Sequence, residues 1–395
     1  MKKSTRKDRR AFIQQSLLFT TGSYFALPAL ARADKHSPST IQENIKYVTA
    51  AAKPDRFFGW PANNGMWKWD NGREILVGFT NGSYQEQSGH NIGKEQLTNL
   101  ARSKDGGKSW IREDPNNFVG DDGEVKPSPG IIRFGHPEFA LRVAATGYHG
   151  TRDKRGHFYI SYDRGKKWGG PYRFNKLNDD KNLKGMDITA RTNYRVTGEN
   201  SIQIYMSARR RDFKYANRLD KPFVAESTDG GKSFKFAGWV VPWTDHYRAV
   251  MPSVVQAGNG DLVMALRRRN PSKEEQPCWI DAYASKDSGR SWTFLSKVGE
   301  TGVDNGNPPG LAMLKDGRLA CCFANRSSSK IFLRISENNG RSWDQEVVVR
   351  DNPFSYDMGY PQLLQNHTGE LVALYYIATE ECQHSYIEAA IITGL

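Results

Sequence analysis

The chain has little that would mark it as a helical, metal-binding or disulfide-stapled protein. Its 395 residues include only four cysteines, and no spacing of cysteine and histidine resembles a zinc site. Cys321 and Cys322 are adjacent in an apolar stretch, so they alternate between the two faces of a strand. Buried free thiols are therefore expected, and a disulfide framework is not. Helical periodicity is almost absent, which favours an all-β fold.

The sequence also lacks linkers, a second long apolar run and a strong excess of one charge. No Pro/Ser-rich or low-complexity tract divides residues 34–395, so we expect one domain there. The net charge is +13, of which residues 1–33 carry +6 and the rest of the chain +7. Because this surplus is scattered, we expect no nucleic-acid partner, and an anionic ligand held by specific arginines fits better.

Residues 1–33 have the composition of an export signal. Basic residues cluster at the start, an apolar stretch follows from Ala11, and Ala31-Arg32-Ala33 offers a small-residue cleavage site. Arg9-Arg10 followed by Phe12-Ile13 favours a twin-arginine signal, which the Tat export machinery would read, over an ordinary secretory leader. We expect a bacterial protein that is periplasmic or secreted. No other apolar run is long enough to span a membrane once the leader is removed.

What the sequence does have is a repeat, a variant of Ser-x-Asp-x-Gly-x-x-Trp. Five copies begin at Ser103, Ser161, Ser227, Ser285 and Ser336, which are 58, 66, 58 and 51 residues apart. Repetition at this period indicates stacked units that cannot bury their apolar faces alone. Asp can accept hydrogen bonds from backbone N–H groups of a tight turn, Gly adopts positive φ, and Trp packs beneath. We therefore interpret these aspartates as structural parts of turns.

A second repeat lies between these turns and predicts the number of blades. Short apolar runs joined by Asn-Gly or Asp-Gly turns are typical of hairpins. Six can be placed, at residues 60–79, 139–145, 192–206, 251–267, 309–323 and 360–376. They predict an all-β, six-bladed β-propeller with Asp-box turns. A strand within residues 45–51 would close the ring by pairing with the last blade.

The residues at the start of each innermost strand should converge at one face of a propeller, because that strand lines the central channel. At five of these starts a proline follows the residue, namely Trp60, His136, Met251, Asn307 and Tyr360. Arg191 occupies the comparable place in the third blade. Proline cannot donate to a ladder and favours an extended residue before it, which explains the prolines. It does not explain the mixture of Trp, His, Arg, Asn and Tyr, which suits a sugar ring.

These repeats resemble those of the sialidase superfamily, whose members carry Asp-boxes on a six-bladed propeller. The resemblance extends from about Arg56 to Thr393, and it includes the bacterial exported BNR-repeat proteins of exo-α-sialidase type. Segments shared with that group are residues 56–61, 306–309 and 357–361. The resemblance implies a glycosidase that uses neither a metal ion nor another cofactor.

Sialidases combine three arginines around a substrate carboxylate with a tyrosine nucleophile, a glutamate that assists it and an aspartate acid/base. Matched residue by residue, the resemblance implies Arg56 as the first arginine, Arg267 as the second and Tyr360 as the nucleophile. The glutamate has no match, because residues 249–251 are Ala-Val-Met. The third arginine and the acid/base aspartate have none either, although Arg326 lies a few residues before the expected arginine.

Other residues extend this candidate site. A planar guanidinium binds a carboxylate through two hydrogen bonds, so Arg191 and Arg326 join the set of anion clamps. Asp357 precedes Tyr360 by three residues and either accepts its proton or caps that loop. Trp60 and Asn307 are candidates for contact with the sugar.

Three functions remain open at this point. The leading one is an exported glycosidase that removes a terminal acidic sugar, sialic acid or a relative, from glycans. The first alternative is a polysaccharide lyase acting on uronate-containing glycans. In it His136 and Tyr360 would transfer protons, and Arg191 would neutralise the uronate carboxylate. The second alternative is a propeller that binds glycans without catalysis. The expected partner in every case is a carbohydrate.

Overall fold

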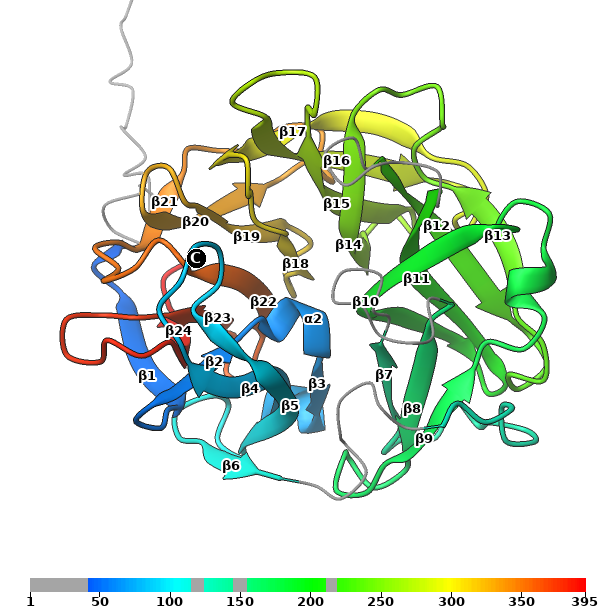
Figure 1. Ribbon diagram of the computed structural model, residues 1–395, viewed down its shortest axis with the longest axis horizontal. Helices are drawn as coiled ribbons and strands as arrows, with labels where there is room; N and C mark the ends of the chain where they lie inside the picture. The colour runs from blue at the N-terminus through cyan, green and yellow to red at the C-terminus, as the bar shows by residue number, and fades with distance from the viewer. Residues whose placement is uncertain (1–41, 115–123, 145–154, 211–218) are drawn as a thin grey trace, which may run out of the picture. The chain divides into compact units, whose positions relative to one another are not determined.

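Six antiparallel sheets follow one another around a central axis (Figure 1). The computed structural model describes residues 42–114, 124–144, 155–210 and 219–395. The expected leader of residues 1–33 lies outside these ranges, so its boundary stays a prediction. No helix within the described ranges is long and apolar enough to cross a membrane.

The strands of the first three blades are as follows. Blade 1 contains β2 (Arg56–Gly59), β3 (Met66–Trp69), β4 (Glu74–Tyr84), β5 (Ile92–Ser103) and β6 (Ile111–Glu113). Its short helix α2 (Pro61–Asn64) separates β2 from β3, and the 3-10 turn η1 (Asp70–Gly72) joins β3 to β4. Blade 2 contains β7 (Ala140–Ala144), β8 (His157–Ser161) and β9 (Gly169–Arg173), with the 3-10 turn η2 (Leu177–Asp179) after it. Blade 3 contains β10 (Met186–Gly198), β11 (Ser201–Arg210), β12 (Asp220–Ser227) and β13 (Lys235–Trp239).

The last three blades have four strands each. Blade 4 contains β14 (Arg248–Gln256), β15 (Leu262–Arg269), β16 (Pro277–Ser285) and β17 (Thr293–Val303). Blade 5 contains β18 (Gly310–Met313), β19 (Leu319–Asn325), β20 (Lys330–Ser336) and β21 (Val347–Arg350). Blade 6 contains β22 (Gly359–Gln365), β23 (Leu371–Ile377), β24 (Tyr386–Ile392) and β1 (Ile45–Ala51). The prediction of an all-β, six-bladed propeller is confirmed.

The ring is closed by a strand from the beginning of the domain. In blade 6 the strand order is β1-β24-β23-β22, and β1 pairs antiparallel with β24 from Ile45 opposite Ile392 to Ala51 opposite Ile387. The Tyr47 hydroxyl also donates a hydrogen bond of 2.7 Å to the Val349 carbonyl of blade 5. The predicted closing strand is therefore confirmed.

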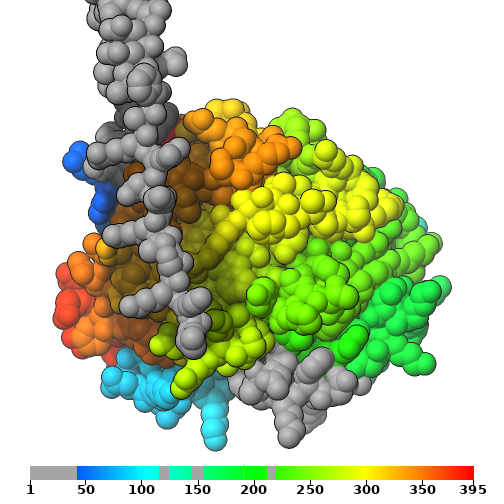
Figure 2. Space-filling model, turned by 90° about the horizontal axis from the view of Figure 1, so that it is seen from above, coloured from blue at the N-terminus to red at the C-terminus, as the bar shows by residue number. Residues whose placement is uncertain are grey.

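Apolar side chains fill the layers between neighbouring blades. Cys322, Leu333 and Tyr375 belong to one such layer between blades 5 and 6, and all three are fully buried. Figure 2 shows consecutive blades side by side, from green through yellow to orange. All four cysteines are free, and three of them are buried, as the sequence predicted.

The Asp-box turns hold their own backbone together. In the first copy Ser103 Oγ donates to Asp105 Oδ1 at 2.8 Å, and Gly107 N donates to Ser103 Oγ at 2.8 Å. Trp110 Nε1 then donates to the Gly107 carbonyl at 2.8 Å. In the fourth copy the corresponding carboxylate is that of Asp287. Hydrogen bonds within the turn, above all the one from the Ser291 hydroxyl, lower its pKa to about 2. The aspartates are engaged within the turns, which agrees with the structural interpretation.

Blade 2 runs differently from the prediction. In blades 3 and 4 the innermost strand starts at the end of the sheet opposite the Asp-box. In blade 2, β7 starts beside the Asp-box, because Ala140 is paired with Ser161. The strand expected within residues 139–145 is therefore β7, the second strand of its blade and not the first. The hairpin pattern missed this because a second strand has the same apolar composition as a first one.

The expected extended geometry before proline is also wrong at three positions. Trp60, Met251 and Tyr360 have φ of 57°, 62° and 52°, in the left-handed region. The strand ladder breaks at two of them, between Val250 and Ser253 and between Gly359 and Gln362. A bulge of this kind redirects a side chain away from the regular alternation of a strand, and left-handed non-glycine residues often mark functional positions. Both bulges occur in first strands, which line the channel, whereas Trp60 directly precedes α2.

Candidate functional site

Tyr360 is fixed at the start of β22 by a contact from blade 5. Its backbone N–H donates to Asn307 Oδ1 at 2.8 Å, and its side chain is 5% exposed. Gly359 makes this approach possible, since a Cβ at that residue would lie 2.2 Å from Asn307 Oδ1. Asn307 is fully buried, and its Nδ2 has no hydrogen-bond partner among the described residues. The amide is therefore available to a group bound beside the tyrosine.

Guanidinium groups from three blades surround the Tyr360 ring. The Cζ atoms of Arg191 and Arg326 lie 5.6 and 5.7 Å from the ring centroid. Burial is the largest single influence and would raise the pKa of Tyr360. The positive charges of Arg267, Arg191 and Arg326 together outweigh it and leave the pKa below its ordinary value of 10. The site therefore stabilises the phenolate of Tyr360 relative to that of an ordinary tyrosine.

Arg326 is already occupied by groups of the protein. Its guanidinium donates to Asp357 Oδ1 at 3.2 Å, to the Met358 carbonyl at 3.1 Å and to the Tyr376 hydroxyl at 2.7 Å. A further hydrogen bond reaches the Asn305 carbonyl at 3.2 Å. Arg326 lies in the predicted site, but it holds the loop before Tyr360 in place and has few donors left for a ligand.

Arg267 has the opposite environment. It is 5% exposed, yet it forms no ion pair with a carboxylate in the described parts of the chain. Its only hydrogen-bond partners there are Asn305 Oδ1 at 3.3 Å and the Met251 sulfur at 3.8 Å, and its Nε has none. A buried cation without a counter-ion is unfavourable, so an anionic ligand would complete this arrangement.

Asp357 is completely buried and does not bond to Tyr360 in the described structure. Its Oδ1 accepts the Tyr376 hydroxyl at 2.5 Å and faces His90 Nδ1 at 2.7 Å, and its Oδ2 accepts the Asn91 N–H at 3.0 Å. Burial would raise the pKa of Asp357, but His90, Arg326 and Tyr376 together hold it below its usual value. Asp357 was predicted either to accept the Tyr360 proton or to cap the loop. Among the described residues it makes no direct contact with Tyr360 that would serve the first role.

Two members of this cluster were not predicted. His90 lies in the loop between β4 and β5, with its ring centroid 6.3 Å from that of Tyr360. Tyr376, in β23, lies 6.1 Å from Tyr360, and burial raises its pKa well above the ordinary value. A signal for His90 exists in the sequence, because Gly89-His90-Asn91 lies in a polar loop between two strands of blade 1. By topology, such a second-to-third-strand loop lies at the channel mouth.

Trp60 is joined to the cluster, and Arg56 is not. The Trp60 ring lies 4.8 Å from the His90 ring at 79° and is 4% exposed. Arg56 Nε donates instead to Asn81 Oδ1 at 2.8 Å. No hydrogen bond or ion pair of the described structure links Arg56 to Tyr360.

His136 was predicted at the channel mouth, and this prediction is wrong. It precedes β7, whose first residue pairs with Ser161 at the Asp-box end of blade 2. Its ring packs against Tyr162 of that Asp-box at 5.3 Å, and its Nδ1 accepts the Glu138 N–H at 3.2 Å. The physical reason is the displaced strand order of blade 2, which places the His-Pro pair at the opposite end of the sheet from Tyr360.

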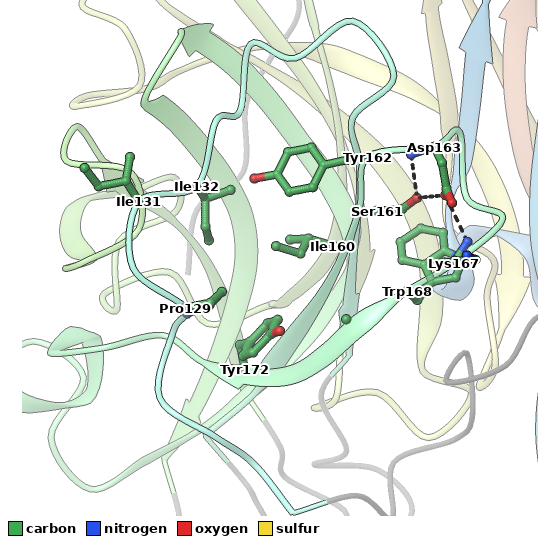
Figure 3. A pocket seen from close by; sticks show the side chains of 11 residues that line it. Pro129, Ile131, Ile132, Ile160, Ser161, Tyr162, Asp163, Lys167, Trp168 and Tyr172 are labelled. Carbon is green, nitrogen blue, oxygen red and sulfur yellow. Dashed lines mark hydrogen bonds between the residues drawn. The ribbon is translucent and has the colours of Figure 1, made fainter.

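A separate cavity of about 520 Å³ lies beside the same Asp-box (Figure 3). Ile131, Ile132, Tyr162 and Tyr172 contribute much of its lining. Asp163 is the carboxylate among the lining residues, and Figure 3 shows it hydrogen-bonded to Ser161 and to the Lys167 backbone. The hydrogen bonds hold that carboxylate within its turn.

Two cavities lie among the strands near the channel. One, of about 10 Å³, is lined among others by Arg191, Met251 and Gln362 and is large enough for a single water molecule. The other, of about 280 Å³, is lined among others by Trp67, Thr192 and Gln362. Figure 1 shows α2 beside this central region. Within the described residues, no group of three or more His, Cys, Asp or Glu side chains could hold a metal ion.

Comparisons with known proteins match the repeat in part of the chain and the fold of most of it. Residues 223–373 match the BNR repeat-like domain. A protein of unknown function from Dyadobacter fermentans DSM 18053 has 18% identity and a TM-score of 0.65, with 88% of this chain and 99% of that chain covered. The predicted resemblance is confirmed as a shared repeat and a shared fold.

Enzymes also share this fold. An α-L-arabinanase of Penicillium chrysogenum, solved with arabinobiose, has 15% identity and a TM-score of 0.56, covering 88% of this chain and 98% of that one. A Hadza microbial sialidase has 12% identity and a TM-score of 0.53, covering 85% of this chain and 65% of that one. No curated protein matches the chain. At these identities the comparisons describe the fold and not the reaction.

Proposed function

We propose that the protein is a glycan-active enzyme of the glycoside hydrolase type that removes a terminal acidic sugar, sialic acid or a relative. The observation that carries this proposal is the buried Tyr360 phenol with three guanidiniums around it and a lowered pKa. Export directed by residues 1–33 is part of the proposal.

The nucleophile and the anion site support each other chemically. A carboxylate beside the anomeric carbon would repel a carboxylate nucleophile, so a phenol is better suited to attack there. Arg267, which lacks a counter-ion in the described structure, and Arg191 would bind the sugar carboxylate. Arg326 acts as a positioning residue that holds the Asp357–Met358 segment ahead of Tyr360.

The solved enzymes with this fold are consistent with a glycosidase but disagree about the sugar. One is described as a sialidase and another as an arabinanase. A neutral arabinose residue would give Arg267 no charge to bind. We therefore favour an acidic sugar, and this choice depends only on the arginines of this chain.

A uronate lyase is the second candidate, and one observation favours it. A lyase needs a histidine beside the tyrosine, and His90 lies there although His136 does not. In that reaction Arg191 and Arg267 would neutralise the uronate carboxylate, and no bond to Tyr360 would form.

The test is to incubate the purified protein with sialosides and with a panel of uronate-containing glycans. Released reducing sugar and ultraviolet absorbance are followed together, because only a lyase creates an absorbing unsaturated uronate. We expect free acidic sugar, no absorbance, and loss of turnover in Tyr360→Phe. Growth of absorbance would establish the lyase, and activity retained in Tyr360→Phe would refute the role of Tyr360.

A further inference from the structure

We propose that His90 is the proton-transfer residue of this site, taking the proton of Tyr360 and passing it to the departing glycosidic oxygen while Asp357 orients it. The inference rests on the proposed function, because it assigns the acid/base of that same reaction. It replaces both the unmatched aspartate and the unmatched glutamate of the sialidase pattern.

The pairing with Asp357 defines how the His90 ring is used. Its Nδ1 lies 2.7 Å from an Asp357 oxygen that is itself 0% exposed, while the His90 side chain is 23% exposed. Because Nδ1 is engaged with Asp357, Nε2 is the ring nitrogen left for Tyr360 or a substrate. No hydrogen bond to Nε2 exists among the described residues. An ionised Asp357 keeps the proton on Nδ1 and leaves Nε2 to accept one, which is the logic of a nucleophile–histidine–aspartate triad.

The loop that carries His90 is anchored from both sides. Gln87 Nε2 donates to the His90 carbonyl at 2.8 Å, and the Asn91 N–H donates to Asp357 Oδ2 at 3.0 Å. The Tyr356 hydroxyl donates to the Gly89 carbonyl. The ring itself packs edge-on against Trp60. This loop therefore has a fixed position relative to the segment before Tyr360.

The distance between the two rings suits proton transfer. Their centroids are 6.3 Å apart and the rings are nearly perpendicular, at 82°. A general base must lie within hydrogen-bond reach of its proton, directly or through one water. Outer atoms of two rings at this separation can come within that reach, directly or through one water.

The steps balance in atoms and charge. His90 Nε2 takes the Tyr360 hydroxyl proton, the Tyr360 oxygen bonds to the anomeric carbon, and the glycosidic C–O bond breaks. The leaving oxygen receives the proton from Nε2. In the second half, water attacks the anomeric carbon and gives a proton to Nε2, the bond to Tyr360 breaks, and the proton returns to the phenolate. Asp357 keeps its negative charge throughout and stabilises the imidazolium.

The first test compares His90→Gln with a matched control, His136→Gln. Glutamine can still hydrogen-bond to Asp357 but cannot carry a proton between groups. With a sialyl-oligosaccharide, whose leaving group needs protonation, kcat/KM should fall by about 100-fold or more in His90→Gln. With the dinitrophenyl sialoside, whose leaving group needs none, the fall should be clearly smaller. His136→Gln should resemble the wild type with both substrates. An equal loss on both substrates would overturn the assignment, since a merely structural role gives that result.

A second measurement needs no substrate. The nitrogen chemical shifts of the His90 ring should report a proton on Nδ1, and Asp357→Asn should remove that preference. A proton on Nε2 in the wild type would overturn the inference. If no sialoside or uronate glycan is turned over while the Nδ1 tautomer is found, the proposed function fails and the His90–Asp357 pair still stands.

Discussion

Two buried arginines at the ends of neighbouring second strands should respond in opposite ways to the same substitution. Arg267 lies near the end of β15 and Arg326 follows β19, and they are 5% and 7% exposed. Arg326 has Asp357 as its counter-ion, whereas Arg267 has no carboxylate partner in the described structure. Replacing each by methionine keeps an unbranched apolar side chain and removes the guanidinium, with its charge and its donors.

The expected magnitudes follow from the cost of an uncompensated buried charge. Arg326→Met leaves Asp357 without its cation and should destabilise the protein by about 3–5 kcal/mol. Arg267→Met removes a cation that is itself uncompensated, so it should be neutral or stabilise the protein by about 1 kcal/mol or more. The two variants should therefore differ by at least about 3 kcal/mol in the free energy of unfolding.

Urea denaturation followed by tryptophan fluorescence measures both values. Free N-acetylneuraminate, added to each protein, should raise the stability of the wild type, because a ligand that binds only the folded state stabilises it. It should leave Arg267→Met unchanged. If Arg267→Met were as unstable as Arg326→Met, or if the sugar stabilised it as much as the wild type, the anion-site argument would be refuted.

Three further predictions concern single groups. Ultraviolet titration should show one tyrosine ionising below the ordinary pKa of 10, because the arginines favour its phenolate, and this step should vanish in Tyr360→Phe. Burial raises the pKa of Asp281 from 3.8 to about 6, with Arg268 opposing it. The folded state thus binds this proton more tightly, stability rises as the pH falls from about 6 to about 4, and Asp281→Asn should stabilise the protein by up to about 3 kcal/mol above that window. Tyr47→Phe, which loses the hydrogen bond to Val349, should cost about 1 kcal/mol in urea denaturation.

Each of these has an outcome that would count against it. An unchanged tyrosine titration in Tyr360→Phe would mean that another phenol carries the low pKa. If the stability difference between Asp281→Asn and the wild type did not shrink toward pH 4, burial would not be what raises the pKa of Asp281. Full stability of Tyr47→Phe would show that the pairing of β1 with β24, and not this hydrogen bond, holds the ring closed.

The architecture was predictable because its signals are local. Each Asp-box turn is built from side chains within a few residues of one another, as Ser103, Asp105 and Gly107 show. The hairpins follow from the same turn chemistry, and closure by β1 follows from the need to cover an exposed strand edge. The position of β7 within blade 2 was mispredicted because its apolar composition is the same as that of an innermost strand. Its place in the sheet depends on its pairing with β8.

The candidate site was predictable only where the topology brings strand starts together. Tyr360, Asn307, Arg191 and Arg267 meet as the propeller geometry requires. His90 was missed because its partner Asp357 is 267 residues away and only the closed ring brings them together.

The conformation of the residues before proline was mispredicted for a different reason. The preference for extended geometry is a local one, and the fold overrides it at Trp60, Met251 and Tyr360.

The central claim is that Tyr360 forms a bond to the anomeric carbon of an acidic sugar. The most direct test uses fluorinated, activated derivatives of N-acetylneuraminate and of the uronic acids, which slow the second half of the reaction. Peptide mass spectrometry would then locate the sugar on the protein. The account predicts a single glycosyl adduct on Tyr360 that is absent from Tyr360→Phe. Turnover of these compounds without an adduct, or an adduct on another residue, would contradict it.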